Sequence, residues 1–180
     1  MFDPLLARIG RALDAAKIRY MVIGGQAVML YGEPRLTKDI DITLGVSIEA
    51  IDAVVQAALA AGLEPLVDPR SFAAETMVLP CRDPDTTIRV DLVLSNSAYE
   101  DGALGRARAV ITAGHPVRFA SPEDLVVHKV IAGRPRDLED VRAIVAKQAG
   151  LNTRFVEETL RAFEAELDEP FVERLRVATS

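Results

Sequence analysis

Tryptophan is absent from this chain of 180 residues, which contains one cysteine and two histidines. A single thiol excludes an internal disulfide, and too few sulfur and imidazole ligands remain for the common zinc frameworks. The two histidines are also too few for the His and Asp clusters of metal-dependent phosphohydrolases. We expect Cys81 to be a small core residue rather than a reactive one.

Aromatic residues make up only 5% of the chain, and the net charge is −6. Few aromatics exclude a platform that stacks several bases, and the acidic balance argues against a broadly cationic surface that grips nucleic acid. No basic segment followed by an apolar run opens the chain, and no apolar run reaches the roughly eighteen residues of a membrane span. These absences predict a cytoplasmic protein without a membrane partner.

The most informative segment is residues 39–42, where Asp and Ile alternate. Side chains on a strand alternate between faces, so Asp39 and Asp41 share one face while the isoleucines enter the core. Two carboxylates on one face repel each other unless a cation lies beside them. Hard oxygen ligands suit Mg²⁺ or Mn²⁺.

A pair of glycines precedes this strand. An apolar segment, residues 20–23, leads into Gly24 and Gly25, and a short helix is expected over residues 27–31. Glycines before a helix start let the backbone N–H groups approach an anion closely. Phosphate beside magnesium is the chemistry that the glycines and the carboxylates have in common.

The order of these features resembles the signature of the nucleotidyltransferase superfamily, which has the polymerase-β-like fold. The family pattern is an apolar residue, Gly, Gly or Ser, a spacer, and then Asp, an apolar residue, and Asp or Glu. The spacer here, residues 26–38, lies at the long end of the family range. Family members carry a third acidic residue on a later strand, and Asp91 lies between apolar neighbours in such a position.

The resemblance implies roles for these residues. Asp39 and Asp41 would hold divalent metal ions, and Asp91 would be the general base or a third metal ligand. The chemistry agrees, because metal ions stabilise the attacking and leaving oxygens when charge develops at the α-phosphorus. Gly24 and Gly25 would direct their N–H groups to the β and γ phosphates.

Two cations lie just before the acidic strand, where a triphosphate would pass. We predict that Arg35 and Lys38 bind nucleotide, with neutralisation of the adjacent acids as the alternative. The run from Arg35 through Thr37 to Asp39 and Asp41 resembles bacterial toxin nucleotidyltransferases of the AbiEii type.

A second candidate cluster follows later in the chain. Lys129 precedes Asp137 by eight residues, between two expected helices, and this spacing also resembles the toxin-type enzymes. Lys129 would reach a triphosphate as a point charge. Asp137 would cap the helix that begins at Leu138, or orient Lys129 or Arg136, and we predict that it belongs to the nucleotide site. Asp140 is expected to be structural.

The expected fold class is α+β. A small mixed sheet flanked by helices, the nucleotidyltransferase core, is expected over residues 1–120, and a C-terminal helical region packed on that core over residues 121–180. Ser47 is expected to cap a helix that ends at Gly62. Strands are expected at residues 20–23, 39–44, 76–81, 87–94, 110–112 and 117–119, and late helices at residues 122–132, 136–147, 153–167 and 170–177.

The implied function is transfer of an NMP from an NTP to an acceptor hydroxyl, on the 3′ end of an RNA such as tRNA, on a protein, or on a small molecule such as an aminoglycoside. The toxin-type resemblance favours a macromolecular acceptor and implies a toxin with a neighbouring antitoxin, whereas the acidic charge argues against RNA. The alternative is a non-catalytic module that binds nucleotide or a partner on a degenerate fold. Asp39, Asp41 and Asp91 are all present, which favours the enzyme.

Overall fold

The computed structural model describes residues 2–95 and 97–180, and contacts divide the chain into two compact units. The first unit runs to Gln26 and resumes over Leu36–Ala120, and the second comprises Ala27–Arg35 and Ser121–Ser180. Contacts thus group the segment Ala27–Arg35 with the C-terminal helices, and the division into a core over residues 1–120 and a helical region over residues 121–180 stays a prediction.

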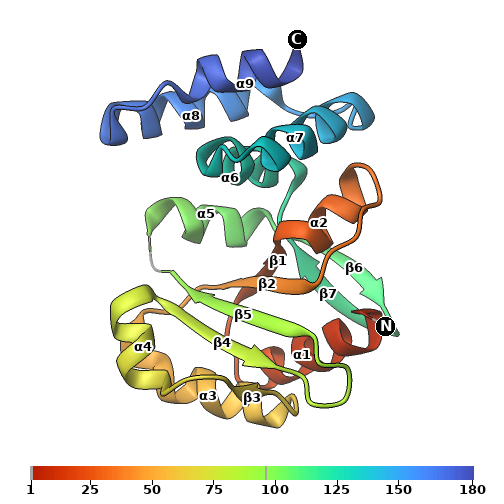
Figure 1. The fold of residues 1–180 in the computed structure, drawn as a ribbon, viewed down its shortest axis with the longest axis vertical. Coiled ribbons are helices and arrows are strands. Elements are labelled where there is room, and N and C mark those ends of the chain that lie inside the picture. The colour runs from red at the N-terminus through yellow and green to blue at the C-terminus, as the bar shows by residue number, and fades with distance from the viewer. Residues whose placement is uncertain (1, 96) are drawn as a thin grey trace. The chain divides into compact units, whose positions relative to one another are not determined.

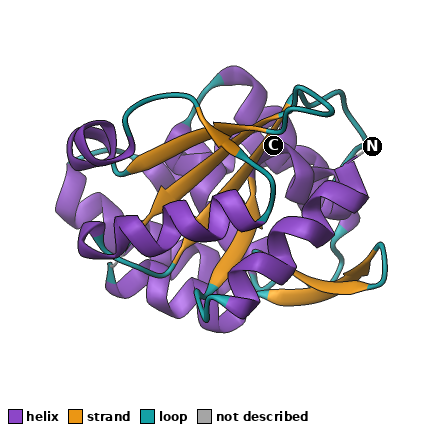
Figure 2. Cartoon of the chain, turned by 90° about the horizontal axis from the view of Figure 1, so that it is seen from below, coloured by secondary structure: helices purple, strands orange, loops and turns teal. Residues whose placement is uncertain are grey.

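The first unit contains a seven-stranded sheet (Figure 2) in the order β3-β4-β5-β2-β1-β7-β6. Strands β1 and β2 pair antiparallel, β2 and β5 parallel, and β4 and β5 antiparallel, so the sheet is mixed and the predicted α+β class is confirmed. The strands are β1 (Tyr20–Ile23), β2 (Asp39–Leu44), β3 (Glu64–Pro65), β4 (Val78–Arg82), β5 (Arg89–Leu94), β6 (Arg108–Thr112) and β7 (His115–Phe119).

Helices of the first unit pack on this sheet and on one another. Helix α1 contacts β7 and α3, and α4 contacts β4. Ser47 is the N-cap residue of a short 3-10 helix that leads into α3, as predicted in position, but its hydroxyl bonds to the Glu49 carboxylate instead of a helix N–H. The bounds are α1 (Phe2–Ala15), η1 (Ile48–Ala50), α3 (Ile51–Ala60), α4 (Pro69–Thr76) and α5 (Ala98–Arg106).

The second unit is helical. Helix α2 (Gly24–Tyr31) begins in the first unit and enters the second at Ala27. Helices α6, α7, α8 and α9 lie side by side (Figure 1): α6 contacts α7, α8 and α9, and α9 also contacts α7 and α8. None of the described helices combines the length and the apolar composition that a membrane-spanning helix needs. The bounds are α6 (Pro122–Ala132), α7 (Pro135–Lys147), α8 (Thr153–Leu167) and α9 (Phe171–Thr179).

Alternation along β2 separates the core from the polar face. Ile40 and Ile42 are buried, whereas Asp39 and Asp41 are only partly buried. Cys81 on β4 is fully buried as expected, and burial, with a smaller contribution from the charge of Asp91, raises the pKa of its thiol to about 12. The sheet therefore carries the acidic side chains on a rigid, well-packed support.

Candidate active site

Parallel pairing of β2 with β5 brings the predicted acids onto one face of the sheet. In this register Asp41 lies opposite Asp91, and Asp39 lies opposite Arg89. Paired residues on neighbouring strands direct their side chains to the same face, and so do residues two apart on one strand. The side chains of these two residue pairs thus form one block on the same face of the sheet, in which Asp41 and Asp91 are immediate neighbours.

Gly24 lies directly against the carboxylate of Asp41. It follows Ile23, which pairs with Asp41 across β1 and β2, and its φ is +61°. A Cβ atom at this position would lie 2.1 Å from Oδ2 of Asp41. Only glycine therefore permits both the left-handed backbone and this close approach.

The start of helix α2 presents donors beside this carboxylate. The first N–H groups of a helix have no partner within the helix, so those at Gly24, Gly25 and Gln26 suit an anion. The side chain of Gln26 is only 5% exposed, and its amide nitrogen has no hydrogen-bond partner among the described residues. A buried donor without a partner costs free energy, which a phosphate oxygen would recover.

Arg89 was not among the predicted site residues, yet it holds Asp91. Its Nε donates to both carboxylate oxygens of Asp91, at 2.9 and 3.1 Å. Hydrogen bonding to Asp91 and the negative charges of Asp91, Asp39 and Asp41 raise the pKa of Arg89 above its usual value. The sequence did contain a signal, because a residue two positions before Asp91 on a strand must share its face.

The residues before β2 hold Asp39. Thr37 is buried, and its hydroxyl donates to Oδ1 of Asp39 at 3.0 Å. Lys38 is exposed, so its ammonium group is accessible to a ligand from solvent.

The carboxylates on this face of the sheet are chemically suited to bind a divalent cation. Asp39, Asp41 and Asp91 supply hard carboxylate oxygens, and Gly24 leaves room at Asp41. Within residues 2–95 and 97–180, no three His, Cys, Asp or Glu side chains are arranged to hold a metal ion. Thr37 and Arg89 donate hydrogen bonds to two of the three carboxylates, those of Asp39 and Asp91.

Lys129 and Asp137, predicted from their spacing, meet in the second unit. Lys129 is 6% exposed, and its Nζ donates to Oδ1 of Asp137 at 2.7 Å and lies 3.0 Å from Oδ2 of Asp140. Asp137 lies within α7 and does not cap it, since Arg134 is the N-cap residue. Burial raises the pKa of Asp137, but hydrogen bonds from Arg134 and Lys129 outweigh it and place that pKa below its usual value.

Arg35 joins the same cluster. Its Nε and one terminal nitrogen donate to the two oxygens of Asp140, at 2.9 and 3.0 Å, and the structural role of Asp140 stays a prediction. Gln148 and Lys147 of α7 also donate to the carbonyl oxygens of Tyr31 and Gly32. Helix α7 thus holds the end of α2 and the loop after it. Contact of Arg35, Lys129 and Asp137 with nucleotide stays a prediction.

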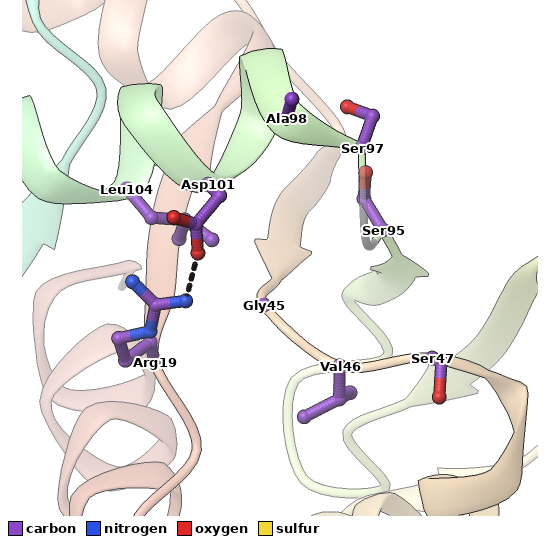
Figure 3. Close-up of a pocket in the computed structure, with 9 residues that line it drawn as sticks. All are labelled: Arg19, Gly45, Val46, Ser47, Ser95, Ser97, Ala98, Asp101 and Leu104. Atoms are coloured by element: carbon purple, nitrogen blue, oxygen red, sulfur yellow. Dashed lines mark hydrogen bonds and ion pairs between the residues drawn. The ribbon is translucent and has the colours of Figure 1, made fainter.

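A separate hollow of about 500 Å³ lies at the other end of β2 and β5 (Figure 3). Ser47 and Ser95 line it, and an ion pair between Arg19 and Asp101 crosses one side. Gly45 in its wall follows the end of β2 and is four residues beyond Asp41, a separation of about 13 Å in extended chain. This hollow is therefore distinct from the acidic face.

Comparison with solved structures shows the nucleotidyltransferase fold. The solution structure of the antibiotic-resistance factor ANT(2'')-Ia matches with a TM-score of 0.63 and 17% identity, over 92% of this chain and 94% of that one. A crystal structure of ANT(2'')-Ia with adenylyl-2''-tobramycin matches with a TM-score of 0.63 and 19% identity, over 91% and 97%. An antigenic nucleotidyltransferase-like protein from Paracoccidioides brasiliensis matches with a TM-score of 0.56 and 17% identity, over 97% and 91%.

No curated protein matched the chain. The profile of one family, described as a nucleotidyl transferase of unknown function (DUF2204), matches residues 4–177. Since that match spans nearly the whole chain, the protein belongs to this family of nucleotidyltransferases.

Proposed function

We propose that the protein transfers an NMP unit from an NTP to an acceptor hydroxyl, with Mg²⁺ or Mn²⁺ held by Asp39, Asp41 and Asp91. The observation that carries the proposal is the pairing of Asp41 with Asp91 on adjacent strands, with Gly24 packed against Asp41. It supports a phosphate site at this point, because the start of helix α2 lies beside the paired carboxylates.

Each residue has a part in the proposed reaction. Gly24, Gly25 and the amide of Gln26 bind the β and γ phosphates, and Lys38 attracts the triphosphate from solvent. Asp91 accepts the proton of the attacking hydroxyl or orients it. When bound, the metal ions neutralise the charge that develops on the attacking and leaving oxygens.

The acceptor is a hydroxyl of RNA, protein or a small molecule. The crystallised relative ANT(2'')-Ia was captured with adenylyl-2''-tobramycin, an adenylylated aminoglycoside, which supports a small-molecule hydroxyl. The net charge of −6 also weighs against RNA. A toxin role with an antitoxin, AbiEii-type specificity and a macromolecular acceptor stay predictions of the sequence resemblance.

The test is a labelling screen. Purified protein is incubated with each α-³²P-labelled NTP and Mg²⁺, separately with total RNA, with protein extract and with a panel of aminoglycosides. We expect one acceptor class to gain label and pyrophosphate to be released. Asp41→Asn should lose this transfer by at least about a thousandfold while remaining folded, because it removes one metal ligand and some of the carboxylate repulsion.

Two outcomes would contradict the proposal. Transfer by Asp41→Asn at the wild-type rate would refute the metal assignment. Tight NTP binding by the wild-type protein, without label in any acceptor class, would favour the non-catalytic module.

A further inference from the structure

Arg89 is bound to the acidic site but remains exposed to solvent. Its Nε contacts both oxygens of Asp91, and its backbone position lies opposite Asp39 across β2 and β5. The Arg89 side chain is 56% exposed, whereas that of Asp91 is 19% exposed. The Arg89 side chain therefore lies mostly in solvent, while the carboxylate that it contacts is largely buried.

The buried cluster of the second unit provides a contrast. There the Lys129 side chain is only 8% exposed and meets two aspartates, a geometry that fixes it in place. An exposed ion pair of this kind contributes little to stability by itself. Within a block of three carboxylates, however, the Arg89 guanidinium also offsets their mutual repulsion.

We propose that Arg89 is an internal counter-ion, whose guanidinium holds Asp91 until a divalent cation displaces it. The inference rests on the proposed function, which places the cation at Asp39, Asp41 and Asp91. The Nε–H group of Arg89 is shared between both oxygens of Asp91, so the guanidinium and the cation compete for the same negative charge. The released guanidinium lies beside the site, where it becomes a donor for the phosphates of the incoming nucleotide.

Competition predicts an effect on metal affinity in the absence of nucleotide. In Arg89→Met the cation meets three carboxylates without a competing charge. We expect Mn²⁺, titrated into the nucleotide-free protein and followed by electron paramagnetic resonance, to bind about threefold to tenfold more tightly. Arg89→Lys, which keeps the charge but loses the planar donor, should fall between.

Arg82 offers a matched control. It lies opposite Arg89 on β4, one strand further from β2, and it is exposed. Because screening and distance weaken its effect, Arg82→Met should change Mn²⁺ affinity by less than about twofold. The melting temperature gives a second readout: Arg89→Met should melt lower than wild type in EDTA and gain more than wild type on addition of Mn²⁺.

The outcomes separate this inference from the proposed function. If Asp41→Asn binds Mn²⁺ as tightly as wild type, the metal site itself is refuted. If Asp41→Asn weakens binding while Arg89→Met matches wild type, only the counter-ion role is refuted. Weaker Mn²⁺ binding by Arg89→Met would also overturn it, because Arg89 would then orient Asp91 for the metal rather than compete.

Discussion

Replacing Gly24 by alanine tests the close approach on which the candidate site depends. The backbone at Gly24 has φ of +61°, and an added Cβ would lie 2.1 Å from Oδ2 of Asp41. Real Cβ contacts begin near 3.0 Å, so the Asp41 carboxylate must move by about 1 Å. The substitution therefore adds backbone strain and displaces a predicted metal ligand at once.

The two effects have different sizes. A left-handed alanine costs about 1–2 kcal/mol of unfolding free energy. Forcing the Asp41 side chain away from its preferred rotamer adds about 0.5–1.5 kcal/mol. The effect on transfer should be larger, because a misplacement of about 1 Å at a reacting centre can cost about a hundredfold in rate.

Gly114 is a matched control for the strain alone. Its φ is +76°, and an added Cβ there meets nothing within 4 Å. Gly114→Ala should lower the melting temperature by about 2–8 °C. Its transfer rate, measured with labelled NTP, should match wild type, whereas Gly24→Ala should lose about a hundredfold. Equal transfer rates in the two variants would refute the claim that Gly24 makes room for Asp41.

Three further predictions concern charge and burial. Lys129→Met removes the buried cation shared by Asp137 and Asp140 and leaves each of them with one arginine, so the free energy of unfolding in urea should fall by about 1–3 kcal/mol; an unchanged midpoint would contradict the structural role of Lys129. Arg134 and Lys129 lower the pKa of Asp137 despite its burial. The ionised carboxylate therefore stabilises the fold above about pH 4, and this stabilisation is lost as the pH falls through the folded pKa. The free energy of unfolding should fall less between about pH 7 and acidic pH in Asp137→Asn than in wild type, and an equal fall in both proteins would contradict this. Cys81 is buried and the pKa of its thiol is raised to about 12, so a thiol reagent at pH 8 should label it only as fast as the protein unfolds, and rapid labelling would show an accessible thiol.

Local patterns predicted much of the secondary structure. The strand over residues 39–44 was expected and observed with the same bounds, because strict alternation of Asp and Ile has a period of two. Helix α6 was also expected with its observed bounds, since Ser121, Pro122 and Gly133 mark its two ends. These signals lie within a few residues of the elements that they define.

Helix α4 was missed although the chain carries a signal for it. Asp68 caps it by accepting from the N–H of Ser71, and Pro69 stands at its first position. The short strand β3 was also missed, since its two residues, Glu64 and Pro65, carry no periodicity. Strand β3 is too short for a sequence pattern to indicate it.

Most contacts within the candidate site could not be predicted, because they join residues that are remote in sequence. Alternation placed Asp39 and Asp41 on one face, but only the register of β2 with β5 puts Asp91 beside Asp41. The pairing of Arg35 with Asp140 joins residues 105 positions apart, and no local pattern indicates it. Spacing identified Lys129 and Asp137 as a pair, while their burial depends on how α6 and α7 pack.

The most direct test of the central claim is a crystal structure with Mn²⁺ and a non-hydrolysable NTP, in which anomalous diffraction data locate the metal ion. The account predicts Mn²⁺ at about 2.0–2.4 Å from carboxylate oxygens of Asp41 and Asp91, with the triphosphate against Gly24 and Gly25. Mn²⁺ and nucleotide bound away from these carboxylates would contradict it.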